Sequence, residues 1–328
     1  MDIQYLEPLW GRWRVEHLLG EGSFGQVWLV RDAGGHEAAV KEVQVPFANG
    51  DLDSARLEGL TLAGAKAYFR ALMEETRREI DLMKALRSCE TVVQFLDSQV
   101  VERGHEFGWV ILILMERLVP FRDRMATGTL TVQDAAHLGR DIALALEACA
   151  GLGIVHRDIK PDNLFYNPRT DRYQLGDFGV AHYLERPTEE KGRAGTLTHM
   201  PPEVFQGAAF TPEADLYALG MILYRLLNDS RIPGLPPFPE PFTPVQRSLA
   251  VDQRLKGGPV GPPSALGYAA LGGAPAGSLG VRFGDTPDDR RLAAALGDIA
   301  WRAIAPRRED RFPGPKQLRL AIELALKT

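Results

Sequence analysis

The chain has 328 residues, a mass of 36.2 kDa and 45% hydrophobic residues, which is long for one typical domain and sufficient for substantial cores. Its 38 basic and 43 acidic residues give a formal net charge of −5, which argues against nucleic acid as a main partner. The two cysteines, Cys89 and Cys149, form neither a disulfide framework nor a zinc site, and their helix-like apolar surroundings predict buried free thiols. No secretory leader or membrane-length apolar run is found, so we expect a cytoplasmic chain without a membrane segment.

The first informative pattern is glycine-rich and covers residues 19–27, in the arrangement G-x-G-x-x-G-x-V. Glycines let the backbone of a hairpin lie close over phosphate groups, which side chains would push away. A plain hairpin and a dinucleotide-binding turn are the alternatives for a pattern this short. Residues 27–30 look like a strand rather than a helix, and no βαβ unit follows, so the dinucleotide interpretation is disfavoured.

A lysine-bearing strand and a helix are predicted next. The strand covers residues 38–43 and carries one lysine, Lys41, for which a solvated edge position is the bland alternative. Residues 67–86 show the apolar spacing of an amphipathic helix. Further on, residues 109–118 form a continuous apolar strand that ends in charged residues, and a buried strand without any ligand would look the same.

Two polar loops follow in the second half of the chain. Residues 156–163 read His-Arg-Asp-Ile-Lys-Pro-Asp-Asn, and residues 174–179 read Gln-Leu-Gly-Asp-Phe-Gly. Taken alone, residues 156–163 could be a polar loop after a helix, and residues 174–179 could contain an ordinary turn. Their order and spacing favour a shared chemical role, because Asp177 comes fourteen residues after Asn163 with an alternating strand between them.

Taken together and in this order, these motifs resemble those of protein kinases. The resemblance implies that Asp158 accepts the proton of a substrate hydroxyl, while Lys160 neutralises charge on the γ-phosphoryl group of ATP. It also implies that Asn163 and Asp177 hold Mg²⁺, for which Mn²⁺ is a substitute. Lys41 would contact the α- and β-phosphates and pair with Glu79 of the following helix. Glu74 and Glu75 are alternative partners for Lys41, and otherwise they would lie on a solvated face of the helix.

The resemblance also implies the residues that bind the nucleotide. Met115 would be the gatekeeper beside adenine, and backbone groups of Glu116 and Leu118 would make the adenine hydrogen bonds. The full set of implied ATP contacts is Gly20, Gly22, Ser23, Phe24, Gly25, Val27, Ala39, Lys41, Met115, Glu116, Leu118 and Phe165.

Residues 195–203 resemble the end of a kinase activation segment. By this resemblance Thr196 hydrogen-bonds near Asp158 and Lys160, Glu203 forms a buried ion pair with Arg311, and Asp215 caps the backbone of the 156–163 loop. Three positions depart from the family pattern, and their effect is expected on packing and substrate docking rather than on chemistry; they are Pro201, His199 and Tyr217.

The predicted fold is α+β and two-lobed, with a small antiparallel lobe bearing one main helix and a larger, mainly helical lobe. We expect the ATP-binding lobe and hinge over residues 1–118 and the catalytic lobe over 119–328. Two stretches interrupt the pattern. Residues 46–66 are expected to make a helical excursion, while 230–289 are so rich in Pro, Gly and Ala that most of them should be loop with a mobile centre.

The expected activity is that of a serine/threonine protein kinase, because Lys160 stands two positions after Asp158 as in such kinases. The architecture and the 230–289 insertion resemble those of bacterial eukaryotic-like enzymes. The protein partner would supply a Ser or Thr acceptor. A pseudokinase, meaning a nucleotide-gated scaffold, is the competing interpretation. A small-molecule phosphotransferase is disfavoured by Thr196, Glu203 and Arg311.

A regulatory site is implied by Arg157, which in kinases of this type pairs with a phosphate on the activation segment. Thr188 is the one Ser or Thr between Gly179 and Gly195, so we expect self-association and autophosphorylation there, with Arg193 as a helper. The alternative is an exposed Thr188 beside acidic neighbours that supply the negative charge alone.

Overall fold

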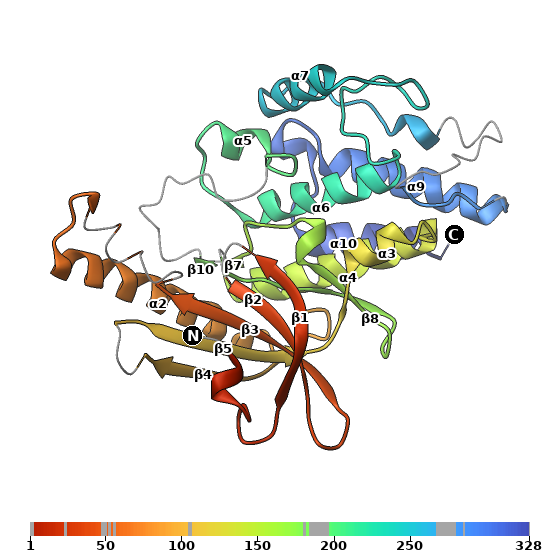
Figure 1. Ribbon diagram of the computed structural model, residues 1–328. Coiled ribbons are helices and arrows are strands. Elements are labelled where there is room, and N and C mark those ends of the chain that lie inside the picture. The colour runs from red at the N-terminus through yellow and green to blue at the C-terminus, as the bar shows by residue number, and fades with distance from the viewer. Residues whose placement is uncertain are drawn as a thin grey trace. The chain divides into compact units, whose positions relative to one another are not determined.

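The computed structural model of this chain describes residues 3–22, 25–46, 51, 54, 57–103, 107–179, 182–183, 197–266, 280–284 and 286–327. The chain divides into two compact units, Met1–Arg117 and Leu118–Thr328 (Figure 1), and each is described by itself. The first unit is built on an antiparallel sheet with one long helix, and the second is mainly helical. The predicted α+β class is therefore confirmed.

The sheet of the first unit has the spatial order β1-β2-β3-β5-β4, and all its neighbours pair antiparallel. Its strands are β1 (Arg14–Gly22), β2 (Gly25–Arg31), β3 (Glu37–Val45), β4 (Phe95–Glu102) and β5 (Trp109–Glu116). The apolar part of β5 is buried throughout because the strand is paired on both sides and the sheet is covered on both faces.

The two faces of the sheet meet different partners. Val40 of β3 packs with Val110 and Leu112 of β5 against the N-terminal segment, which begins with the 3₁₀ helix η1 (Ile3–Leu6). The helix α2 (Leu62–Ala85) packs against β3, β4 and β5 (Figure 1). Successive side chains of a strand point to opposite faces, so Lys41, next to Val40, points toward the α2 face.

Helix α2 begins five residues before the predicted start. Thr61 is its N-cap, and its side chain accepts a hydrogen bond from the backbone N–H of Gly64 at 3.0 Å. The apolar stripe of the helix is buried at Phe69, Ile80 and Met83. The predicted helical excursion over 46–66 is thus partly the first turn of α2, and several residues of that stretch lie outside the described ranges.

The core of the second unit is formed by two long helices, α4 (Val132–Gly151) and α6 (Pro212–Leu226), most of whose residues are buried. Helix α4 packs against α6, α9 and α10. The remaining helices are α3 (Phe121–Ala126), α5 (Pro202–Phe205), α7 (Pro244–Leu255), α9 (Pro287–Ala303) and α10 (Pro315–Ala325). The strands are β6 (Val119–Pro120), β7 (Ile154–Val155), β8 (Leu164–Asn167), β9 (Arg172–Leu175) and β10 (His182–Tyr183).

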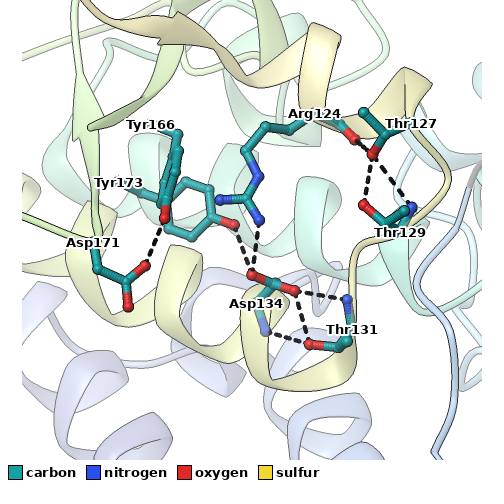
Figure 2. A network of polar contacts seen from close by, with 8 residues as sticks. All are labelled: Arg124, Thr127, Thr129, Thr131, Asp134, Tyr166, Asp171 and Tyr173. Carbon is teal, nitrogen blue, oxygen red and sulfur yellow. Dashed lines mark hydrogen bonds and ion pairs between the residues drawn. The ribbon is translucent and has the colours of Figure 1, made fainter. Parts of the chain in front are cut away.

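A polar network fastens the β8–β9 hairpin to α3 and α4 (Figure 2). Asp134 closes a capping box with Thr131 at the start of α4 and also pairs with Arg124 of α3 at 3.2 Å. The hydroxyl of Tyr173 donates to the same carboxylate at 3.3 Å, and the Arg124 guanidinium lies 3.9 Å from the ring centre of Tyr166. Burial and the Asp134 charge raise the pKa of Tyr173, so its hydroxyl keeps its proton. The network therefore holds the hairpin in a fixed position on α4.

The described part of the 230–289 stretch is mostly loop, as expected, whereas one prediction about the cysteines is wrong. The 230–289 stretch contains α7, a twelve-residue helix that begins with a capping box between Thr243 and Gln246. Its expected mobile centre falls on residues 267–279, which lie outside the described ranges. Cys149 is buried in α4 as expected, whereas Cys89 follows the turn after α2 and is half-buried. The polar residues around that turn admit solvent there.

Candidate active site

The first unit brings Lys41 and Glu79 together. Lys41 lies at the centre of β3, with Val27 of β2 and Ile113 of β5 as its neighbours across the sheet. Its Nζ donates to Oε1 of Glu79 at 2.7 Å, and the two side chains are 13% and 5% exposed. An ion pair this buried holds the ammonium group in one place. Glu74 and Glu75, the competing residues, are exposed on α2.

The glycine-rich hairpin joins β1 to β2, with Gly22 opposite Gly25 and Gly20 opposite Val27. Gly25 has a φ of +143°, and a Cβ on this residue would lie 1.9 Å from the carbonyl oxygen of Glu42. Only glycine fits there, because the hairpin backbone runs against β3. Ser23 and Phe24, at the tip, lie outside the described residues.

The end of β5 carries the proposed adenine contacts. Met115 is half-buried and lies between Ala39 of β3 and Phe95 of β4. Glu116 is fixed by two bonds with Gln94: its backbone N–H donates to the Gln94 carbonyl at 3.1 Å, and its carboxylate accepts from the Gln94 N–H at 2.8 Å. The backbone of this segment is therefore held in a defined position next to β4. Leu118 is buried and begins the second unit.

The second unit brings Asp158, Lys160 and Asn163 together. Lys160 Nζ donates to Oδ2 of Asp158 at 2.6 Å, and the side-chain amide of Asn163 donates to the same oxygen at 3.1 Å. The Asn163 amide also donates to the Asp158 carbonyl at 2.8 Å, which ties the two ends of the loop together. Asp158 is 14% exposed, so its carboxylate is oriented by these donors yet still reachable.

The β8–β9 hairpin places Asp177 beside Asn163. Leu164 pairs with Leu175 at the base of the hairpin, and the next backbone bond runs from the Gly176 N–H to the Asn163 carbonyl at 2.9 Å. Asp177 follows directly, with a φ of +58°. A carboxylate and an amide oxygen are hard donors that suit Mg²⁺, which takes few protein ligands and completes its shell with phosphate and water. Phe165, the remaining proposed nucleotide contact, is half-buried on β8.

The backbone that carries Asp158 is fixed from beneath by Asp215 of α6. Its carboxylate accepts from the backbone N–H of His156 at 2.7 Å and of Arg157 at 2.8 Å, as the sequence predicted. Burial raises the pKa of Asp215 to about 7, although both backbone donors and Arg157 oppose that rise. Arg157 has a φ of +72°, so the loop keeps a backbone conformation that L-residues rarely adopt.

The imidazole of His156 fills the space behind the loop. It is fully buried, and its Nε2 lies 3.1 Å from the Gly176 carbonyl, while the N–H of Asp158 points to Nδ1 at 3.4 Å. Burial lowers the pKa of His156, so the ring is neutral and its Nε2 carries the proton that Gly176 accepts. The residue thus links the Asp158 loop to the segment that bears Asp177.

The segment after residue 196 is held by two arginines. Arg311 makes a bidentate ion pair with Glu203, at 2.6 and 2.8 Å, as predicted. Arg254 of α7 was not predicted: its guanidinium donates to the carbonyls of Leu197 at 2.5 Å and Met200 at 2.6 Å, and to the Tyr217 hydroxyl at 2.8 Å. Tyr217, which departs from the family pattern, therefore accepts a hydrogen bond from Arg254 that the sequence did not predict.

His199, another departure from the family pattern, is buried beside this segment. Burial, together with the charges of Arg225, Arg254 and Lys160, lowers its pKa to about 3, so the ring is neutral at pH 7. Its Nε2 faces Nη1 of Arg225 at 3.3 Å. Thr188, Arg193 and Thr196 lie outside the described residues.

The arrangement has the parts of a phosphoryl-transfer site: a paired lysine under a glycine hairpin, and an oriented carboxylate beside an amide and a second carboxylate of the kind that suit Mg²⁺. The comparisons agree, because residues 13–243 match the protein kinase domain. The chain therefore belongs to the protein kinase family. Helix α7, which carries Arg254, begins at Pro244 and thus lies just beyond the matched residues.

Several curated protein kinases are similar to this chain. Serine/threonine-protein kinase GIN4 of Saccharomyces cerevisiae is 30% identical over 226 residues, which cover 68% of this chain and 19% of that protein. Calcium-dependent protein kinase 5 of Oryza sativa subsp. japonica is 30% identical over 226 residues, covering 67% of this chain and 36% of that protein. CBL-interacting protein kinase 16 of the same organism is 28% identical, with 66% and 43% covered. The chain thus spans less than half the length of these relatives, and all three are eukaryotic.

In the described part of the chain, we find no helix with the length and apolar character needed to cross a bilayer.

Proposed function

We propose that this chain is a serine/threonine protein kinase that transfers the γ-phosphoryl group of ATP to a protein hydroxyl. The observation that carries the proposal is the Asp158 carboxylate, oriented by Lys160 and Asn163 at the end of a hairpin that also presents Asp177. In this proposal Asp158 accepts the hydroxyl proton at its carboxylate, because that oxygen is both positioned and accessible. The Lys160 ammonium stays close enough to balance negative charge on the transferred group.

The nucleotide would be held by the first unit and oriented by its Lys41–Glu79 pair. Glu79 fixes the ammonium, and Lys41 then offers positive charge to the phosphates at a constant position. The glycine hairpin, Met115 and the backbone of Glu116 and Leu118 would surround the rest of the molecule. Transfer from ATP requires a compartment rich in ATP, and we therefore place the chain in the cytoplasm.

Asn163 and Asp177 would hold Mg²⁺, or Mn²⁺ as a substitute. When bound, such an ion neutralises phosphate charge and helps to align the transferred group. Within the described residues no group of three or more His, Cys, Asp or Glu side chains gathers at one point. The oxygens of Asn163 and Asp177 are compatible with an ion whose remaining ligands are phosphate and water. Asp177→Ala is expected to abolish activity, and an unchanged magnesium dependence in that variant would refute the ligand assignment.

We also propose autophosphorylation on Thr188, with the phosphate paired to Arg157. Arg157 belongs to the start of the catalytic loop, and its guanidinium lies 5.0 Å from the ring centre of Phe210. Mass spectrometry of protein expressed from active and Asp158→Asn genes tests this step. Phosphate on Thr188 is expected in the active form alone, and fully active enzyme with unmodified Thr188 would remove the proposal.

One assay separates the proposed activity from its competitors. Radiolabelled ATP is offered to the enzyme with a generic protein acceptor, with small-molecule hydroxyl acceptors and with the enzyme alone, followed by phosphoamino acid analysis. Label on serine or threonine of protein is expected. Label on tyrosine would refute the acceptor class, transfer to small molecules alone would favour a small-molecule phosphotransferase, and ATP binding without any transfer would favour a pseudokinase.

A further inference from the structure

Five cationic side chains of the second unit either contact residues 197–200 or lie on the catalytic loop, beside it or on α7, and we call them the basic cluster. Arg254 contacts the carbonyls of Leu197 and Met200, and Arg225 contacts the ring of His199 between them. The other members are Lys160, which pairs with Asp158, Arg122, which pairs with Asp162, and Arg247 on α7. The cluster therefore adjoins both the catalytic loop and the segment where a protein acceptor would dock.

Three members of the cluster have no acidic partner among the residues that the structure describes. Arg254 donates to two carbonyls and a phenol, all of which are neutral. Arg225 contacts the Ser230 carbonyl at 3.2 Å and the neutral His199 ring. Arg247 is exposed, and its guanidinium makes no hydrogen bond or ion pair with a described residue. The acids at the cluster, Asp158 and Asp162, are already paired with Lys160 and Arg122.

The electrostatics agree with this geometry. Burial lowers the pKa of Arg225, and the neighbouring charges of Arg247 and Arg122 lower it further. Arg247 and Arg122 therefore each repel the Arg225 guanidinium. The chain as a whole carries a net charge of −5, so the cluster does not reflect a general excess of basic residues. Cations that repel one another and lack an acidic partner favour the arrival of an anion.

We propose that the protein substrate carries acidic side chains within a few residues of its acceptor hydroxyl, and that Arg225 and Arg247 bind them. The proposal rests on the proposed kinase function and adds the class of substrate. Arg247 is exposed and Arg225 is half-buried, so a docked peptide can reach both side chains. Arg254 acts through the backbone of Leu197 and Met200, and is a positioning residue for the docking segment.

The test uses matched peptides with one serine in an alanine-rich background. Glu, its neutral isostere Gln, or Lys is placed in turn at each of the four positions on either side of the serine. One charge-assisted hydrogen bond to an acidic side chain is expected to raise kcat/KM about tenfold over the Gln peptide, and Lys is expected to lower it. Equal kcat/KM for Glu and Gln at every position, or a preference for Lys, would overturn the proposal.

A charge-reversal pair assigns the effect to the cluster. Arg247→Glu is expected to remove most of the preference for Glu peptides. Arg290→Glu is the matched control, because Arg290 is an exposed arginine at the start of α9 whose side chain contacts no described residue. Its neighbour Asp289 contacts Gln133 at the start of α4, and that helix extends about 30 Å before the catalytic loop begins. An equal loss of preference in both variants would contradict the assignment.

A binding measurement keeps the two proposals apart. The same peptides with alanine in place of the acceptor serine are titrated by fluorescence anisotropy at low and high salt. The Glu peptide is expected to bind about tenfold more tightly than the Gln peptide at low salt, with a smaller difference at high salt. Selective binding of the Glu peptide, together with no phosphate transfer to the serine peptides, would refute the kinase function alone. Equal binding of the Glu and Gln peptides would refute the acidic-substrate proposal.

Discussion

Replacing Arg311 by methionine is expected to destabilise the second unit by about 3 kcal/mol. The guanidinium is 1% exposed and makes two bonds to Glu203. It also donates to the carbonyls of Ala305 at 2.8 Å and Pro306 at 3.1 Å, and it lies 4.6 Å from the ring centre of Tyr217. Breaking a buried ion pair from one side costs about 3–5 kcal/mol. The Glu203 side chain is 24% exposed, so water recovers part of its solvation and the lower end applies.

Thermal unfolding measures this loss. In a unit of this size, 1 kcal/mol shifts Tm by about 2–4 °C, so Arg311→Met is expected to unfold about 6–12 °C earlier than the wild type. Arg308→Met is the matched control, because Arg308 pairs with Glu213 at 2.9 Å but is 51% exposed. Such a surface pair contributes about 1 kcal/mol or less. A shift for Arg311→Met no larger than that of the control would refute the reasoning.

Three further predictions concern other parts of the chain. Lys41→Met is expected to lower kcat for peptide phosphorylation by about 100-fold or more, with an unchanged circular dichroism spectrum, because Glu79 then has no ammonium group to position; near-normal kcat would contradict it. Gly25→Ala is expected to cost about 1–3 kcal/mol in thermal unfolding, whereas Gly20→Ala, whose Cβ would meet no atom within 4 Å, should be nearly neutral; equal effects would count against the close approach to Glu42. His199 is protonated more readily in the unfolded chain, so its contribution to stability is present above pH 6.5 and is lost on acidification. Between pH 6.5 and 4.5 the free energy of unfolding, measured in urea, should fall by about 2 kcal/mol more for the wild type than for His199→Gln. Equal losses would contradict the buried neutral ring.

Features that depend on local pattern were predictable from the sequence. The apolar run of β5 is continuous and the apolar stripe of α2 is periodic, so both elements follow from neighbouring residues. The catalytic loop is a short continuous motif and is predictable for the same reason. The Glu203–Arg311 pair joins residues 108 positions apart, and a motif was needed to predict it. Helix α2 begins five residues before its predicted start, and the N-cap at Thr61 is the local signal that the apolar stripe alone does not supply.

Features that depend on unanticipated long-range contacts could not be predicted in this way. Arg254 contacts residues 54 and 57 positions away, from a stretch whose proline and glycine content favoured loop. The Thr243 and Gln246 capping box was a local signal for α7, and it could have found the helix but not its partners. The contact of Arg225 with His199 follows from tertiary packing alone.

The proposed transfer of phosphate from ATP to a protein hydroxyl is tested most directly by Asp158→Asn. The wild type and the variant are compared for transfer of radiolabelled γ-phosphate from ATP to a serine peptide, and ATP affinity is measured on both proteins. Unchanged ATP affinity and a transfer rate lower by about two to four orders of magnitude are expected, because a positioned proton acceptor has been removed while the Lys41–Glu79 pair remains. Near-normal transfer by Asp158→Asn would contradict the proposed role of Asp158.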